Sequence, residues 1–275
     1  MLGLSGAYMQ LGAAIALLWG PSWISKFGWQ AWWWLLAGLT LLMAAWLWQV
    51  VPNDAGKGSM SVRPAAESWQ RRLRETLSAR GPWLVAFCFA LYFAQWLAVI
   101  GFLPMIYARG GMTGGNTALL TALVAAVNIV GNIVSGRLLA RGVPAKLILY
   151  AGFAVMALGA ITAFANAPAD MDGWACLPGV RFTAVLLFSM VGGMVPGTLF
   201  SLAVQLAPSE RTVSTTVGWM QQWSALGQFA GPPAVAWVAG ATGGWHWIWM
   251  VTAGCALGGA LLALQISRLL AQARR

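Results

Sequence analysis

Charged residues are scarce in this sequence, and acidic residues are the scarcest of them. Only 8% of the 275 residues are Asp, Glu, Lys or Arg, and 6 residues are acidic. A soluble domain carries about 25% charged residues. The shortage therefore excludes an ordinary soluble fold. Together with 60% hydrophobic residues, it indicates that the main solvent of this chain is lipid.

Histidine and cysteine are also rare. His246 is the one histidine, Cys88 and Cys255 fall inside apolar runs, and Cys176 stands alone in a more polar stretch. These residues form neither a disulfide framework nor a pair with metal-ligand spacing. We find no nucleophile and base pair and no phosphate-binding loop in the sequence. The sequence therefore predicts no metal site, no cofactor and no enzymatic activity.

Long apolar runs are what the sequence has in abundance. A bilayer core about 30 Å thick is crossed by about 20 helical residues. The runs that meet this length cover residues 2–25, 29–51, 82–107, 116–139, 145–166, 181–206, 212–239 and 245–270. They lack the alternating pattern of membrane barrel strands, and backbone groups in lipid must pair internally. We predict an all-α, polytopic membrane helix bundle with about eight transmembrane helices.

The basic residues are unevenly distributed between the two sides that this threading defines. Only Lys26, Arg109 and Arg181 fall on one side. The other side carries Lys57, Arg63, Arg71, Arg72, Arg74, Arg80, Arg137, Arg141, Lys146, Arg211, Arg268, Arg274 and Arg275. The positive-inside rule then places the 52–81 loop and the C-terminus in the cytoplasm. Because these charges lie at helix ends, the net charge of +10 does not indicate nucleic acid as a partner.

Amide side chains indicate which helices face the interior of the bundle, because an amide group exposed to hydrocarbon is energetically costly. The runs 29–51, 145–166 and 245–270 keep amides out of their interiors, so we expect these helices to face lipid. The polar residues of the remaining runs share faces at helical spacing. The predicted substrate-binding residues are Tyr92, Gln95, Asn128, Asn132, Gln221 and Gln222. The alternative is that they form hydrogen bonds between helices and only stabilise the bundle.

A hairpin pattern occurs twice in the chain. Gly20-Pro21 and Gly28-Trp29 are matched by Gly231-Pro232 and Gly244-Trp245, at offsets of 211 and 216 positions. A long internal repeat in a hydrophobic chain is typical of transporters built from two related halves.

Proline and glycine positions predict kinks or close helix packing. Proline removes a helical hydrogen bond, and small residues spaced by four let helices approach each other. The residues concerned are Pro21, Gly193, Pro196, Gly197, Gly227, Gly231 and Pro232.

The second hairpin, with Pro208 to Arg211 at its entry, Gly231-Pro232 and Gly244-Trp245, resembles the last two helices of the major facilitator superfamily. The resemblance implies that the chain holds helices five to twelve of a twelve-helix fold. Residues 1–51 would then be the last two helices of the N-terminal bundle, 52–81 a cytoplasmic linker and 82–275 the C-terminal six-helix bundle. The family's loop motif is half kept, with Ala140 where the acidic residue would be.

The resemblance also implies a function. It points to transport of a small solute by alternating access in the bacterial inner membrane, possibly with a coupling ion, and to Arg137, Arg141 and Arg211 as inner gate or topology residues. The segment 95–104 further resembles bacterial cyanate-type carriers. The alternative is a non-transporting fragment or partner subunit, because four helices are absent. In that case we expect the chain to associate with itself, with the lipid bilayer as its other partner.

Overall fold

The computed structural model describes residues 7–51, 68–109, 115–165 and 178–273, and all regular structure in these ranges is helical. The α-helices of the described residues are α1 (Ala7–Val50), α2 (Trp69–Ser78), α3 (Arg80–Arg109), α4 (Gly115–Ala140), α5 (Ala145–Phe164), α6 (Pro178–Gly192), α7 (Met194–Gln205), α8 (Val213–Ala241) and α9 (Ile248–Ala273). Two short 3-10 helices, η3 (Glu210–Thr212) and η4 (Trp245–Trp247), precede α8 and α9. The protein is an all-α membrane bundle.

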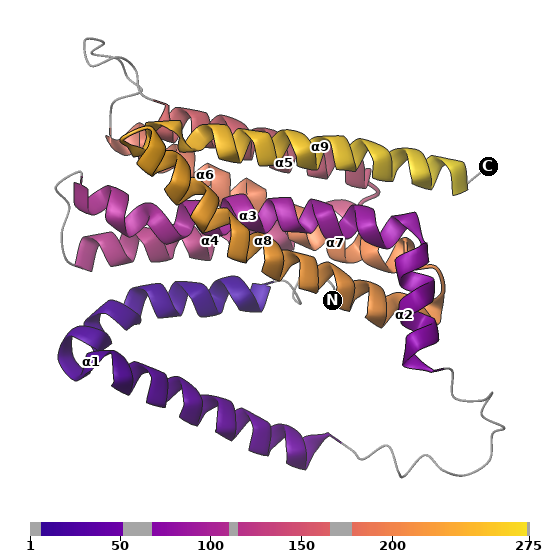
Figure 1. Cartoon of the computed structure of the whole chain (residues 1–275), viewed down its shortest axis with the longest axis horizontal. Helices are drawn as coiled ribbons and strands as arrows, with labels where there is room; N and C mark the ends of the chain where they lie inside the picture. Colours follow the sequence, from indigo (N-terminus) through magenta and orange to yellow (C-terminus); the bar gives the residue numbers. More distant parts are fainter. Residues whose placement is uncertain (1–6, 52–67, 110–114, 166–177, 274–275) are drawn as a thin grey trace.

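Helix α1 contains the first two apolar runs and folds back on itself at Gly28. This glycine has a φ of 82°, a left-handed conformation that residues with a Cβ disfavour. The 42-residue apolar span of α1 would be about 63 Å long if straight, which is twice the thickness of the bilayer core. The bend at Gly28 therefore divides α1 into the two helical arms seen in Figure 1.

Six segments of the described chain are long and apolar enough to cross a membrane, and α8 is not among them. Its three glutamines and two prolines lower its mean hydropathy. Helix α8 packs along α3, as Figure 1 shows, and this contact covers part of its surface. Each of the eight apolar runs of the sequence thus lies on helix within the described residues, with α6 and α7 sharing one run.

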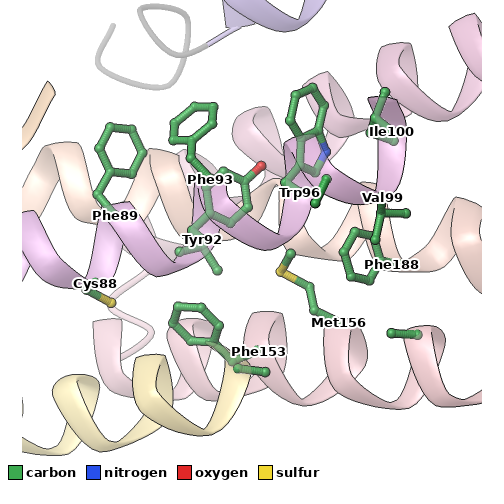
Figure 2. Packing of buried hydrophobic residues seen from close by; sticks show 14 of the residues in the cluster. Cys88, Phe89, Tyr92, Phe93, Trp96, Val99, Ile100, Phe153, Met156 and Phe188 are labelled. Carbon is green, nitrogen blue, oxygen red and sulfur yellow. The ribbon is translucent and has the colours of Figure 1, made fainter. Parts of the chain in front are cut away.

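Helix α3 lies at the centre of the bundle. It packs against α8, α9, α7 and α4, while α5 packs against α6 and α9. Figure 2 shows Phe89 and Phe93 on one side of α3 and Phe153 of α5 on the other side, with Phe188 of α6 near Val99. These side chains are at most 3% exposed, and they belong to one buried cluster to which α4, α7, α8 and α9 also contribute side chains.

Glycine pairs set the distance between α3 and α8. A Cβ at Gly227 would overlap the carbonyl oxygen of Ala90, and one at Gly231 would overlap that of Ala94. The two helix backbones therefore touch along one turn, as the small-residue spacing predicts.

Proline residues lie inside several of the helices and close to the boundary between two others. Helix α1 continues through Pro21, and α8 continues through Pro232 and Pro233. The α6 and α7 helices are separated at Gly193, one turn before Pro196. That position fits the effect of proline, because Pro196 cannot donate to the carbonyl group one turn earlier.

The described part of the 52–81 segment is the short helix α2, while residues 52–67 lie outside the described residues. Ser68 caps its N-terminus by accepting a hydrogen bond from the backbone N of Arg71 at 3.4 Å. Leu73 and Leu77 are half-buried and Trp69 is 65% exposed. The two leucines therefore face the rest of the protein, whereas Trp69 is largely exposed.

Candidate functional site

Asn128 is the centre of a buried polar cluster between three helices. Its Nδ2 atom donates to the hydroxyl oxygen of Tyr92 on α3 at 2.9 Å and to the carbonyl oxygen of Ser189 on α6 at 2.7 Å. All three residues are fully buried. One amide group of α4 therefore connects the polar faces of α3 and α6.

The cluster continues along α4. Asn132 donates from Nδ2 to the side-chain oxygen of Asn128 at 3.1 Å and to its carbonyl oxygen at 3.2 Å. Ser135 then donates to the carbonyl oxygen of Asn132 at 2.8 Å. The polar stripe predicted on this helix thus forms a chain of hydrogen bonds inside the bundle.

Glycine residues explain why Asn128 can reach α6. Gly131 lies against the carbonyl oxygen of Met190, and Gly193 lies against the carbonyl oxygen of Asn128. Any larger residue at either glycine would push α4 away from α6. The two glycines therefore bring α4 and α6 close enough for the short side chain of Asn128 to reach α6.

Trp96 belongs to the cluster, although the sequence analysis did not select it. Its indole Nε1 donates to the Ser189 hydroxyl oxygen at 3.0 Å, and both residues are buried. Trp96 lies four residues after Tyr92, so the helical period of α3 is the signal that identifies it. Figure 2 shows Trp96 and Tyr92 on the same stretch of α3.

Gln95 is fully buried, and neither atom of its amide group has a hydrogen-bond partner within the described structure. The Oδ1 atom of Asn132 is also buried without a donor that satisfies it. Most buried polar groups in proteins are hydrogen-bonded, because burying them unpaired is costly. These amide atoms therefore offer unused hydrogen-bonding capacity at the centre of the bundle.

The glutamines of α8 lie apart from this cluster. Gln221 is half-buried, and its Oε1 atom is 3.3 Å from the Ser224 hydroxyl group, while Gln222 is exposed. Within the described residues, no hydrogen bond joins either glutamine to Tyr92 or Asn128. The structure therefore unites Tyr92, Asn128 and Asn132 and leaves the two glutamines on a separate helix.

The three arginines predicted at the inner gate lie at exposed positions. Arg137 is in the last turn of α4, Arg141 follows α4, and Arg211 is in η3. Gly142 ends α4 with a φ of 82°, and its backbone N donates to the carbonyl oxygen of Leu139 at 3.0 Å. This glycine turn leads directly into α5.

The polar cluster is electrically neutral and closed. None of its members carries a charge, and Tyr92, Asn128 and Asn132 are all 0% exposed. Gln95 is equally buried, but within the described residues no hydrogen bond joins it to these three. The carboxylates within the described residues are Glu75 on α2 and Glu210 in η3, both in the segments that connect the long helices. The site can therefore recognise a ligand by hydrogen bonds, and it would have to open for the ligand to enter.

Comparison with protein families gives a match. A family model described as Major Facilitator Superfamily matches residues 1–232 of the chain. No curated protein matches the sequence.

Proposed function

The chain belongs to the Major Facilitator Superfamily, and we propose that it carries a small solute across the bacterial inner membrane by alternating access. Members of this family are secondary transporters rather than enzymes. Residues 1–51 would supply the end of the N-terminal bundle and residues 82–275 the C-terminal bundle, with 52–81 as the cytoplasmic linker. The two bundles would rock about a site near the middle of the membrane.

The unpaired amide group of Gln95 is the observation that carries the proposed site. A buried amide without partners is destabilising, so its presence at 0% exposure requires an explanation. A solute bound beside Tyr92 and Asn132 would supply the missing partners. In this proposal Gln221 and Gln222 contribute from α8 when the bundle opens.

The neutrality of the cluster supports recognition by hydrogen bonds instead of ion pairs. Proton-coupled carriers relay protons through buried carboxylates or histidines. The described carboxylates, Glu75 and Glu210, are outside the long apolar helices. We therefore propose that any coupling ion is handled by groups outside the cluster around Asn128.

The arginines near the ends of α4 and η3 support the proposed orientation. Their side of the bundle carries most of the basic residues of the sequence, which favours the cytoplasmic face. Arg137, Arg141 and Arg211 would then stand at the inner mouth of the transport path.

Binding by the purified full chain tests the site directly. The 18 tryptophans provide a fluorescence signal for titration with small amides, polyols, nucleosides, monocarboxylates and cyanate. Cyanate is included because residues 95–104 resemble cyanate-type carriers. We expect a neutral solute to bind and the substitution Gln95→Leu to abolish binding. Because no described residue forms a hydrogen bond with the Gln95 amide group, this variant should fold at least as stably as the wild type.

Gln30→Leu is the matched control, because Gln30 is an exposed glutamine near the bend of α1. It should bind the solute normally. Unchanged binding by Gln95→Leu would refute the proposed site. Uptake of the bound solute into proteoliposomes then tests transport, and binding without uptake would identify the chain as a non-transporting subunit.

A further inference from the structure

Two grooves flank the end of α9 that carries Arg268. The first has a volume of about 770 Å³ and lies between the α4 to α5 turn, α7 and α9, with Lys146 on its wall. The second has a volume of about 520 Å³ and lies between α2, the start of α3 and α9, with Arg80 on its wall. Arg268 lines both grooves. The positively charged side chain of Arg268 therefore borders both grooves.

The walls of both grooves combine positive charge with apolar surface. Every charged residue that lines them is basic, and none is acidic. Leu139 and Leu270 supply apolar surface in the first groove, and Phe87 and Leu262 supply it in the second. Within the described residues, no carboxylate forms an ion pair with Arg268. The chemistry of the walls matches a ligand with an anionic group and long apolar chains.

The position of the grooves corresponds to the interface between the hydrocarbon core and the headgroups. Lys146 is in the first turn of α5, Arg80 begins α3, and Arg268 is near the end of α9. Basic side chains at the ends of apolar helices lie at headgroup level. The exposed fraction of Leu158 on α5 and of Leu257 on α9 is 64%, so both helices present leucine to the lipid.

We propose that this end of α9 binds an anionic phospholipid. Its phosphate group would lie between Lys146 and Arg268, and its acyl chains would occupy the apolar parts of the two grooves. Basic pockets between transmembrane helices are suited to anionic headgroups. A small inorganic anion would satisfy the charges but leave the apolar surface uncovered. The proposal does not depend on the solute that the chain transports.

Native mass spectrometry of the detergent-purified full chain tests the site. The protein is titrated with phosphatidylglycerol, which is anionic, and with phosphatidylcholine, which has no net charge. We expect phosphatidylglycerol to bind more tightly. In the double variant Lys146→Gln and Arg268→Gln its affinity should fall about 30-fold, which is about 2 kcal/mol at 1.4 kcal/mol per tenfold.

The double variant Arg72→Gln and Arg74→Gln is the matched control, because it removes two charges from α2 outside both grooves. It should bind phosphatidylglycerol with nearly wild-type affinity. Lys146→Arg with Arg268→Lys should also retain binding. Ala271→Trp, at an exposed position on the wall of the first groove, keeps both charges and should weaken binding by filling the space for a chain.

Several results would overturn the proposal. Equal affinity for the two lipids, or equal losses in the groove and control variants, would show that no specific site exists. Displacement of the lipid by millimolar inorganic phosphate would assign the groove to a soluble anion. If the glutamine variant fails to fold by circular dichroism, unchanged binding by Ala271→Trp refutes the site by itself.

Discussion

The Nδ2 atom of Asn128 lies 2.9 Å from the hydroxyl oxygen of Tyr92 and forms a hydrogen bond that joins α4 to α3. The same nitrogen donates its second hydrogen to the carbonyl oxygen of Ser189 at 2.7 Å, which joins α4 to α6. An amide NH₂ group has two hydrogens, so both bonds can form at once. Hydrogen bonds between membrane helices contribute about 0.6 to 2 kcal/mol each, so this residue fixes three helices relative to one another.

Removing this junction should destabilise the bundle. For Asn128→Ala we expect the free energy of unfolding to fall by about 1 to 3 kcal/mol, because Asn132 also loses an acceptor. Thermal unfolding in detergent, followed by tryptophan fluorescence, measures the change. Gln30→Ala removes an exposed amide and should leave the unfolding temperature unchanged. An equal effect of the two variants would contradict the assigned role of Asn128.

The bond between Trp96 and Ser189 should be detectable as an energetic coupling. We expect a double-mutant cycle of Trp96→Phe and Ser189→Ala to give a coupling energy of about 0.5 to 1.5 kcal/mol. Each single variant removes one partner of the same buried hydrogen bond. If the changes in unfolding free energy of the two single variants simply add in the double variant, the hydrogen bond between Trp96 and Ser189 does not form.

The close approach of α3 and α8 should tolerate no side chain at Gly227. For Gly227→Ala we expect a loss of about 1 to 3 kcal/mol, because the new methyl group overlaps the carbonyl oxygen of Ala90. Gly218→Ala is the control on the same helix, since a Cβ at Gly218 meets no atom within 4 Å. This control should be neutral or more stable by up to about 1 kcal/mol, owing to helix propensity. The reverse order of stability would refute the packing.

The turn of α1 should depend on Gly28. For Gly28→Ala we expect a cost of about 1 to 2 kcal/mol, because the left-handed backbone conformation strains a residue with a Cβ. Gly38→Ala lies in the second arm of α1 and has open space around its Cβ. It should not destabilise the protein. Equal unfolding temperatures for the two alanine variants would argue against the bend at Gly28.

The proposed orientation can be tested with cysteine labelling. Cys176 lies between the predicted helices 145–166 and 181–206, on the side opposite the 52–81 loop, and it falls outside the described residues, whereas Cys88 is fully buried. A membrane-impermeant maleimide should therefore label wild-type protein from the periplasmic side at Cys176. In a Cys176→Ser background, Gly142→Cys should be labelled only in inside-out vesicles. The opposite sidedness would invert the topology.

The polar residues selected from the sequence illustrate how far local patterns can be trusted. The spacing of Asn128 and Asn132 places them on one face of α4 in both the sequence and the structure, because the helical period is a local property. The partners of Asn128, Tyr92 and Ser189, lie on other helices, and neither these bonds nor the bond from Trp96 to Ser189 was predicted from the sequence. The grooves beside Arg268 were not visible in the sequence either, since they are formed by helices far apart along the chain.

The amino-acid sequence by itself determined that the protein lies in a membrane, that its fold is all-helical and approximately which residues each helix covers. These properties follow from the length and composition of continuous segments, because a helix in lipid pairs its own backbone groups. Only the tertiary structure decided that α1 turns at Gly28, that Asn128 is paired and that Gln95 is not. Such outcomes depend on the rotation and separation of neighbouring helices, which in turn depend on close contacts such as Gly193 against Asn128.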